Sequence, residues 1–146
     1  MIVNTAYIYM GIGGGGGTPV NPNLWQDGVS NYPVVFTNSK INSEGLQFNK
    51  YGAGDATFSE LTLKSFNNLT LSGRATGGGM NPKVEIIIEF YSGDNVLIGT
   101  RSATFLKSEN SVAVDIPSSA KIQNAKIKIK KAAYGSPSTL SSALLS

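Results

Sequence analysis

A turn signal recurs about every ten residues along most of this chain, and short runs of strand-forming residues lie between the turns. The turn signals are clusters of glycine, asparagine, serine and proline, such as Gly77-Gly78-Gly79 and Ser92-Gly93-Asp94-Asn95. This spacing predicts an all-β antiparallel sandwich or barrel with almost no helix. The predicted strands cover residues 32–36, 45–49, 57–64, 68–75, 83–91, 95–100, 103–107, 111–116 and 121–131.

The segment 83–91 has the clearest strand pattern. Every second residue from 84 to 90 is apolar, whereas Glu85 and Glu89 lie between them. Because successive side chains of a strand point to opposite faces, one face should be buried and the other solvated. The same reasoning applied to two further strands gives a predicted buried set of Val84, Ile86, Ile88, Phe90, Leu69, Leu71, Ile127 and Ile129.

The glycine-rich segment 11–17 separates the start of the chain from the rest, because a dense run of glycines is entropically costly inside a strand or helix. We expect residues 11–22 to form a Gly/Pro-rich tether and residues 1–10 to form a separate arm with strand propensity. Such an arm can pair with a sheet edge, either of another protein or of its own domain. The candidate partner-binding residues of the arm are Ile2, Val3, Tyr7, Ile8 and Tyr9.

The folded domain is expected over residues 23–134, followed by a C-terminal tail at 135–146. Within that tail, Leu140, Ala143 and Leu144 have helical spacing, but the segment is too short to form a stable helix alone. The first ten residues lack the basic start of a signal peptide, and no apolar run approaches the length of a membrane span. We therefore expect no membrane partner.

The chain contains neither histidine nor cysteine. Their absence excludes Ser-His-Asp and Cys-His nucleophile arrangements, ordinary zinc sites and iron–sulfur sites. We expect no catalytic residue, no cofactor and no metal site, and hence no enzyme. A structural calcium ion near a loop stays an alternative, since aspartates lie in or beside the turns at Asp27, Asp55, Asp94 and Asp115.

Gly11, Gly13 and Gly16 match the G-x-G-x-x-G pattern of dinucleotide-binding loops. That reading requires a helix immediately afterwards, whereas Pro19 and Pro22 follow here. The glycines are therefore interpreted as tether. Glu85 and Glu89 share one strand face but lie about 13 Å apart along it, which is too far for a glycosidase pair.

Twelve lysines and arginines against nine acidic residues give a net charge of +3. The basic cluster consists of Lys121, Lys126, Lys128, Lys130 and Lys131, in which three lysines alternate with isoleucines as on a half-buried strand. No aromatic residue is interleaved with these lysines. We interpret them as a solvated strand face and expect no nucleic-acid partner. The carboxylates of 83–91 are candidates to lie opposite these lysines on a neighbouring strand.

Four aromatic residues are candidates for stacking on a sugar ring: Trp25, Tyr32, Tyr51 and Tyr91. Ligand sites favour aromatic rings beside a few polar groups. Core or edge packing is the alternative for each of them, because rings also fill sandwich cores well.

The order of features from residue 23 to 132 resembles carbohydrate-binding-module-like jelly rolls, which occur as appendages of tailed-bacteriophage virion proteins. The matching segments are Asn23-Leu24-Trp25-Gln26-Asp27-Gly28, Ser65 to Gly73, Val84 to Gly99, Val112 to Pro117 and Ala125 to Ile129. The resemblance implies a two-sheet antiparallel jelly-roll sandwich. It does not assign sugar-binding residues to positions of this chain.

Two functions follow from the resemblance together with the arm. The first is a non-enzymatic structural protein of the virion, assembled in the host cytoplasm. It would be a capsid decoration or head-fibre subunit, present in many copies or as a homo-oligomer, and bound to capsid or tail proteins through residues 1–22. The alternative is a glycan-binding module for host adhesion, in a tail fibre or baseplate, that binds a surface glycan.

Overall fold

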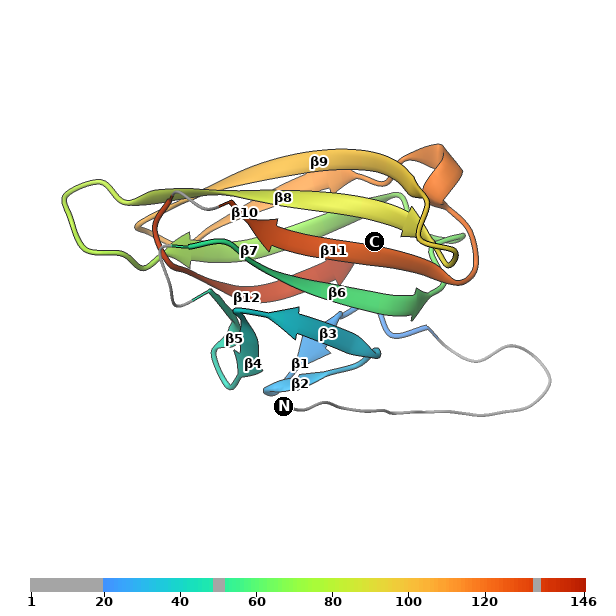
Figure 1. Ribbon diagram of the computed structural model, residues 1–146, viewed down its shortest axis with the longest axis horizontal. Coiled ribbons are helices and arrows are strands. Elements are labelled where there is room, and N and C mark those ends of the chain that lie inside the picture. The colour runs from blue at the N-terminus through green and yellow to red at the C-terminus, as the bar shows by residue number, and fades with distance from the viewer. Residues whose placement is uncertain (1–19, 49–51, 133–134) are drawn as a thin grey trace.

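The computed structural model describes residues 20–48, 52–132 and 135–146. In these residues two five-stranded antiparallel sheets pack face to face, which confirms the predicted all-β jelly-roll sandwich (Figure 1). We name each sheet after its central strand. The β12 sheet has the order β10 (Asn110–Asp115), β7 (Asn68–Ala75), β12 (Ser138–Leu145), β5 (Gly45–Phe48) and β4 (Lys40–Asn42).

The β11 sheet has the order β3 (Val34–Thr37), β6 (Gly54–Leu61), β11 (Ala125–Lys131), β8 (Lys83–Ser92) and β9 (Leu97–Leu106). A small hairpin of β1 (Trp25–Gln26) and β2 (Val29–Ser30) precedes both sheets. The only helical element in the described ranges is one 3-10 turn at Ser118–Ala120. None of the described residues forms a helix long and apolar enough to cross a membrane.

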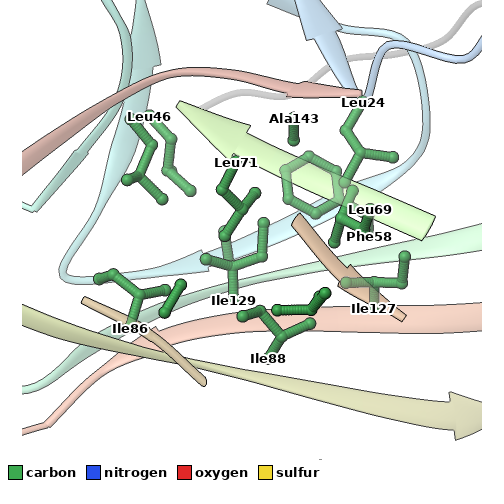
Figure 2. Close-up of a cluster of buried hydrophobic side chains, with 14 of the residues drawn as sticks. Leu24, Leu46, Phe58, Leu69, Leu71, Ile86, Ile88, Ile127, Ile129 and Ala143 are labelled. Carbon is green, nitrogen blue, oxygen red and sulfur yellow. The ribbon is translucent and has the colours of Figure 1, made fainter. Parts of the chain in front are cut away.

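The core lies between the two sheets, where alternate residues of the long strands meet (Figure 2). All eight residues of the predicted buried set are exposed by 1% or less. Ile86 and Ile88 of β8 and Ile129 of β11 come from one sheet, and Leu71 of β7 comes from the other. The period-two pattern therefore identified the inward side of these strands correctly.

The predicted C-terminal tail is wrong, because residues 138–145 form β12 at the centre of a sheet. A β-bulge shifts the register between Leu140 and Ser142 where β12 pairs with β7. The extra residue lets Leu140 and Ala143 both face the core although they are three positions apart. A spacing of three is also typical of a helix, which explains the helical pattern in the sequence. The folded domain therefore extends past residue 134 to Leu145.

The first residues of the domain lie beside the far end of β12. Leu24 N–H donates to Ala143 O (3.0 Å), and Leu145 N–H donates to Pro22 O (2.7 Å). These residues continue along β12 beyond the part that pairs with β5. The entry and the end of the domain are thus joined by backbone hydrogen bonds.

Several predicted strand boundaries also differ from the structure. The expected break between residues 100 and 103 is wrong, because β9 runs unbroken through it. The strand expected over 57–64 begins earlier, because β6 already starts at Gly54. A Cβ atom on Gly54 would lie 2.7 Å from Asn38 O, so this glycine permits a close backbone approach rather than a turn.

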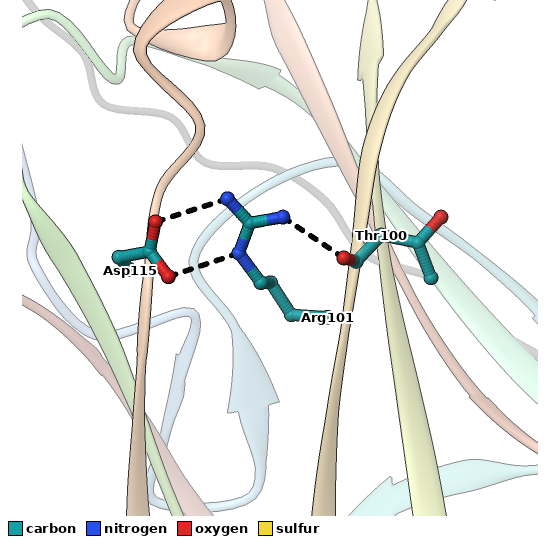
Figure 3. Close-up of polar contacts among 3 residues, drawn as sticks. All are labelled: Thr100, Arg101 and Asp115. Atoms are coloured by element: carbon teal, nitrogen blue, oxygen red, sulfur yellow. Dashed lines mark hydrogen bonds and ion pairs between the residues drawn. The ribbon is translucent and has the colours of Figure 1, made fainter.

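An ion pair joins the two sheets at one edge of the sandwich (Figure 3). Arg101 of β9 donates through Nε and Nη2 to the two carboxylate oxygens of Asp115 of β10, both at 2.9 Å. Its Nη1 donates to Thr100 O, also at 2.9 Å. The hydrogen bond from Arg101 lowers the pKa of Asp115.

Candidate functional site

The outer face of the β11 sheet carries charged residues in neighbouring rows on three strands. The cross-strand register places Lys128 between Thr57 of β6 and Glu89 of β8, and it pairs Lys126 with Tyr91. The inner residues of the same strands belong to the core, so these side chains point outward. We call this surface the charged face and define it by Asp55, Thr57, Glu85, Glu89, Tyr91, Lys126, Lys128 and Lys130.

Tyr91 is held in place by a hydrogen-bonded network on this face. Its Oη donates to Glu89 Oε1 at 2.7 Å, and the other carboxylate oxygen of Glu89 lies 3.1 Å from Lys130 Nζ. The Glu89 side chain is 14% exposed and that of Lys130 is 39% exposed. Both carboxylate oxygens are therefore occupied, and the tyrosine ring is oriented before any ligand arrives.

The network shifts two pKa values in opposite directions. The hydrogen bond to Glu89, followed by partial burial and the charges of Glu89 and Asp55, raises the pKa of Tyr91 to about 12. Partial burial alone would raise the pKa of Glu89. The hydrogen bonds from Tyr91 and Lys130 and the charges of Lys130 and Lys128 outweigh that effect and lower the pKa of Glu89. At neutral pH the pair is a neutral phenol and a carboxylate.

The turn between β8 and β9 fixes a second lysine. Ser92 O accepts a hydrogen bond from Asn95 N–H (3.0 Å), and Asn95 adopts a left-handed backbone with φ +67°. This places Asn95 Oδ1 at 2.7 Å from Lys126 Nζ. Lys128 has no hydrogen-bond or ion-pair partner among the described side chains and backbone atoms.

Apolar side chains border the tyrosine at the same end of the sheet. Leu97 of β9 is the cross-strand partner of Tyr91 and is 52% exposed, and Val96 in the adjoining turn is 60% exposed. The charged face thus combines an aromatic ring, an apolar margin and several hydrogen-bonding groups. Such a mixture is typical of ligand-binding surfaces.

The outer face of the β12 sheet has a different chemistry. Ser142 of β12 and Ser111 of β10 both pair with Ser72 of β7, and the hydroxyl oxygens of Ser72 and Ser111 lie 2.6 Å apart. Thr139 Oγ1 donates to Gln47 Oε1 at 3.1 Å. We call this surface the hydroxyl face and define it by Gln47, Thr70, Ser72, Ser111, Thr139 and Ser142. The described part of this face carries no aromatic ring.

Of the four candidate stacking residues, Trp25 lies in the core. It is 3% exposed, its ring stacks on Phe58 with centroids 5.8 Å apart, and its Nε1 donates to Ser141 O at 3.2 Å. The β1–β2 hairpin places it there. Trp25 therefore offers no ring face to a ligand, and the alternative of core packing holds for it.

Tyr32 is half-buried in the loop before β3. Its Oη donates to Asn21 O at 2.6 Å, and burial raises its pKa to about 12. Tyr51 and the five arm residues lie outside the described residues. Tyr91 is therefore the one described aromatic ring on the outer face of either sheet.

The predicted lysine face is partly confirmed. Lys126, Lys128 and Lys130 point outward, and Glu89 lies opposite them as expected. Lys131 is an exception, because it is 1% exposed and faces inward. Its Nζ donates to Gly52 O (2.7 Å) and Ala132 O (3.3 Å), and burial lowers its pKa.

Sequence reasoning missed the margin of the charged face. Asn95, Val96 and Leu97 appeared only as a turn and the start of a strand. The signal that could have identified Leu97 is its position directly across the hairpin from Tyr91. In the described ranges, no three acidic side chains lie close enough together to hold a metal ion.

No family model matches this sequence, and no curated protein has a significant match. Solved structures do match the fold. PfGH50B superposes on 78% of this chain with a TM-score of 0.59 and 15% identity, and this chain spans 22% of its length. TmCBM61 was solved in complex with β-1,4-galactotriose. The match covers 86% of this chain and 94% of the TmCBM61 chain, with a TM-score of 0.53 and 11% identity.

A family 11 carbohydrate-binding module from Clostridium thermocellum, in complex with a β-1,3-1,4-mixed-linked tetrasaccharide, covers 77% of this chain and 80% of its own length at 12% identity, with a TM-score of 0.49. The likeness to TmCBM61 extends over nearly the whole of both chains. The described domain is therefore similar in fold to a carbohydrate-binding jelly roll.

Proposed function

We propose that this protein is a non-catalytic glycan-binding module that binds its ligand on the charged face. The observation that carries the proposal is Tyr91, a ring on the outer face of a jelly-roll sheet, oriented by Glu89 and bordered by Leu97. The likeness to TmCBM61, which was solved with a galactotriose, supports the same reading.

The chemistry of the face suits a sugar ring. One side of a pyranose is largely apolar and can cover an aromatic ring, while its hydroxyl groups need hydrogen-bond partners. Lysine ammonium groups supply donors around Tyr91, and the Thr57 hydroxyl group supplies both a donor and an acceptor. Because the network is already formed, the ligand does not have to order these side chains, which lowers the entropic cost of binding.

The carboxylates of the charged face are not arranged for glycoside hydrolysis. Its carboxylates Glu85 and Glu89 lie on the same face of one strand, too far apart for a glycosidase pair. Glu89 is also engaged with both Tyr91 and Lys130. The face can therefore hold a glycan, but it lacks a general acid and a base on opposite sides of a scissile bond.

Binding to a panel of neutral and acidic polysaccharides tests the proposal, with affinity electrophoresis as a screen and calorimetry for the ligands that bind. Tyr91→Ala should weaken the best ligand by about thirtyfold, the loss typical of a truncated central anchor. Tyr91→Phe keeps the ring and should retain most of the affinity. Thr104→Ala, an exposed change farther along the same face, is the matched control.

Binding that survives Tyr91→Ala unchanged would move the site away from the charged face. A protein that binds no glycan of the panel would contradict the function itself.

Attachment to a virion stays a separate prediction, since it rests on the arm and tether of residues 1–22. The comparisons support glycan binding rather than this role. A virion subunit that presents a glycan-binding domain to a host surface would combine both functions. Deletion of residues 1–17 should abolish incorporation into particles and leave glycan binding unchanged; full incorporation of the shortened protein would contradict the anchoring role.

A further inference from the structure

We infer that the glycan bound by the charged face is acidic, with a uronate carboxylate that pairs with Lys128 beside a sugar ring stacked on Tyr91. This inference rests on the proposed function, because it names the ligand class for the same face. It is carried by the difference between Lys128 and its two neighbouring lysines.

The flanking lysines on β11 already have partners. Lys130 Nζ lies 3.1 Å from Glu89 Oε2, and Lys126 Nζ donates to Asn95 Oδ1 at 2.7 Å. Lys128 lies midway between them, and the described residues give it no polar partner. Lys128 is therefore the lysine of this row whose ammonium group has no polar partner among the described residues, so all three of its N–H donors can turn to a ligand.

Glu89, the acidic neighbour of Lys128, attracts its ammonium group through charge but forms no hydrogen bond or close ion pair with it. Glu89 stands directly across the strand pair, but its two oxygens are taken by Tyr91 Oη and by Lys130 Nζ. On the other side Lys128 faces Thr57, which is uncharged. Asp55 stands opposite Lys130 instead. The Lys128 ammonium group thus keeps its hydrogen-bond donors for an incoming carboxylate, with Lys126 and Lys130 on either side of it along β11.

The register places the cation and the ring at a suitable separation. Tyr91 pairs with Lys126, so it is the diagonal neighbour of Lys128 across one strand gap. Diagonal neighbours in an antiparallel pair lie about 7–8 Å apart, and a lysine stem can span part of that distance. A sugar ring over Tyr91 would bring an exocyclic carboxylate toward Lys128 Nζ.

The other charges on the face favour a ligand with spaced negative charges over a dense polyanion. Glu89 stands opposite Lys128 and Asp55 stands opposite Lys130, so a phosphodiester chain laid along the row of lysines would meet repulsion from both acids. A uronate polymer carries its charge at the ring edge, with at most one carboxylate to a sugar. A single available lysine beside a single ring matches that pattern.

Matched polymers provide the test. Homogalacturonan, alginate and hyaluronan are each compared with the same polymer after methyl esterification, which keeps the backbone and removes the charge. At least one acidic form should bind about tenfold more tightly than its ester, the value of one charge-assisted hydrogen bond. This preference should shrink as salt is added.

Lys128→Gln should remove the preference for the acidic form, so that the acidic and the esterified member of each pair then bind with equal affinity. Lys40→Gln is the control, because Lys40 is exposed on β4 of the opposite sheet. Equal affinities for both members of every pair, or binding of neutral glycans only, would overturn the inference and leave the proposed function intact.

A single-stranded oligonucleotide that binds as tightly as the best polysaccharide would also overturn the inference, since the face would then be a general polyanion surface. Absence of binding to every glycan would contradict the proposed function and the inference together.

Discussion

The two outer faces of the sandwich cover the same core, but their side chains form different kinds of polar contact. On the charged face, the Glu89 carboxylate binds both Tyr91 and Lys130, so the position of the Tyr91 ring depends on an ion pair as well as on its own hydrogen bond. On the hydroxyl face, neutral groups pair locally, as Ser72 does with Ser111. The jelly roll thus fixes which side chains face outward, while the chemistry of those outward residues determines whether a face can recognise a ligand.

The second difference concerns how the sheets are completed. The β11 sheet takes its central strand from residues 125–131, and the β12 sheet takes its own from residues 138–145. The hydroxyl face therefore depends on the last strand of the domain.

Removal of residues 135–146 should have the largest effect. The β12 sheet would split into β10–β7 and β5–β4, and Leu140, Ala143 and Leu145 would leave the core. We expect the loss of cooperative unfolding in urea, followed by the fluorescence of Trp25, the one tryptophan of the chain. Deletion of residues 1–17 is the control and should leave the transition unchanged. A cooperative transition after the C-terminal deletion would show that the charged face persists without the hydroxyl face.

Gly45→Ala should destabilise the β12 sheet selectively. Gly45 has φ +120°, and a Cβ there would lie 2.1 Å from Leu140 O on the central strand. We expect a loss of about 3 kcal/mol in the free energy of unfolding, from backbone strain and displacement of β12. Gly78→Ala, where nothing lies within 4 Å, should be neutral. Equal stabilities of these two variants would contradict the close approach.

The phenol of Tyr91 should titrate near pH 12, measured by the difference in ultraviolet absorbance between the wild type and Tyr91→Phe. The unfolded chain loses this proton near pH 10, so the stability that Tyr91 contributes is fully present below pH 10 and is lost as the pH rises toward 12. Glu89→Gln should move the titration toward pH 10. A midpoint near 10 in the wild-type protein would contradict the hydrogen-bonded network.

Glu89→Gln should have the smallest effect on stability, at about 1 kcal/mol or less at pH 7, because Lys130 is well exposed. The folded pKa of Glu89 is lowered, so its contribution is present above the unfolded value of about 4.5 and is lost as the pH falls through the folded value. Glu85→Gln on the same strand face is the control. Ser72→Ala on the hydroxyl face should lower the free energy of unfolding by a similar amount at every pH. A pH-dependent loss there would contradict the distinction between a charged and a neutral network.

Much of the fold could be predicted from the sequence where the strands are regular. Strand β7 was predicted with its observed bounds, and the inward residues of β7, β8 and β11 follow a strict alternation. Each of these strands pairs with one neighbour through a bulge, but the extra residue lies on the neighbour (β12, β9 or β6), so the alternation of β7, β8 and β11 is not interrupted. Prediction failed at β12, where one bulge changed the period from two to three and made the strand look helical.

The candidate site was predictable only in part. Alternation placed Tyr91, Glu89 and the three lysines on outward faces, but it could not show that β8 and β11 are neighbours in a register that leaves Lys128 without a partner. Trp25 was misjudged as a stacking candidate because its place in the core depends on a two-residue hairpin strand and on contact with Phe58. Such contacts between distant segments are not encoded in local patterns.

The position of β12 also sets the order of events during synthesis. All strands of the β11 sheet have been translated by residue 131, so that sheet can assemble while the chain is still being made. Until residue 145 has left the ribosome, β7 and β5 each expose an unpaired edge at the place where β12 will insert. Exposed edges of this kind recruit other strands, and a chain stalled before residue 138 would therefore be prone to aggregation.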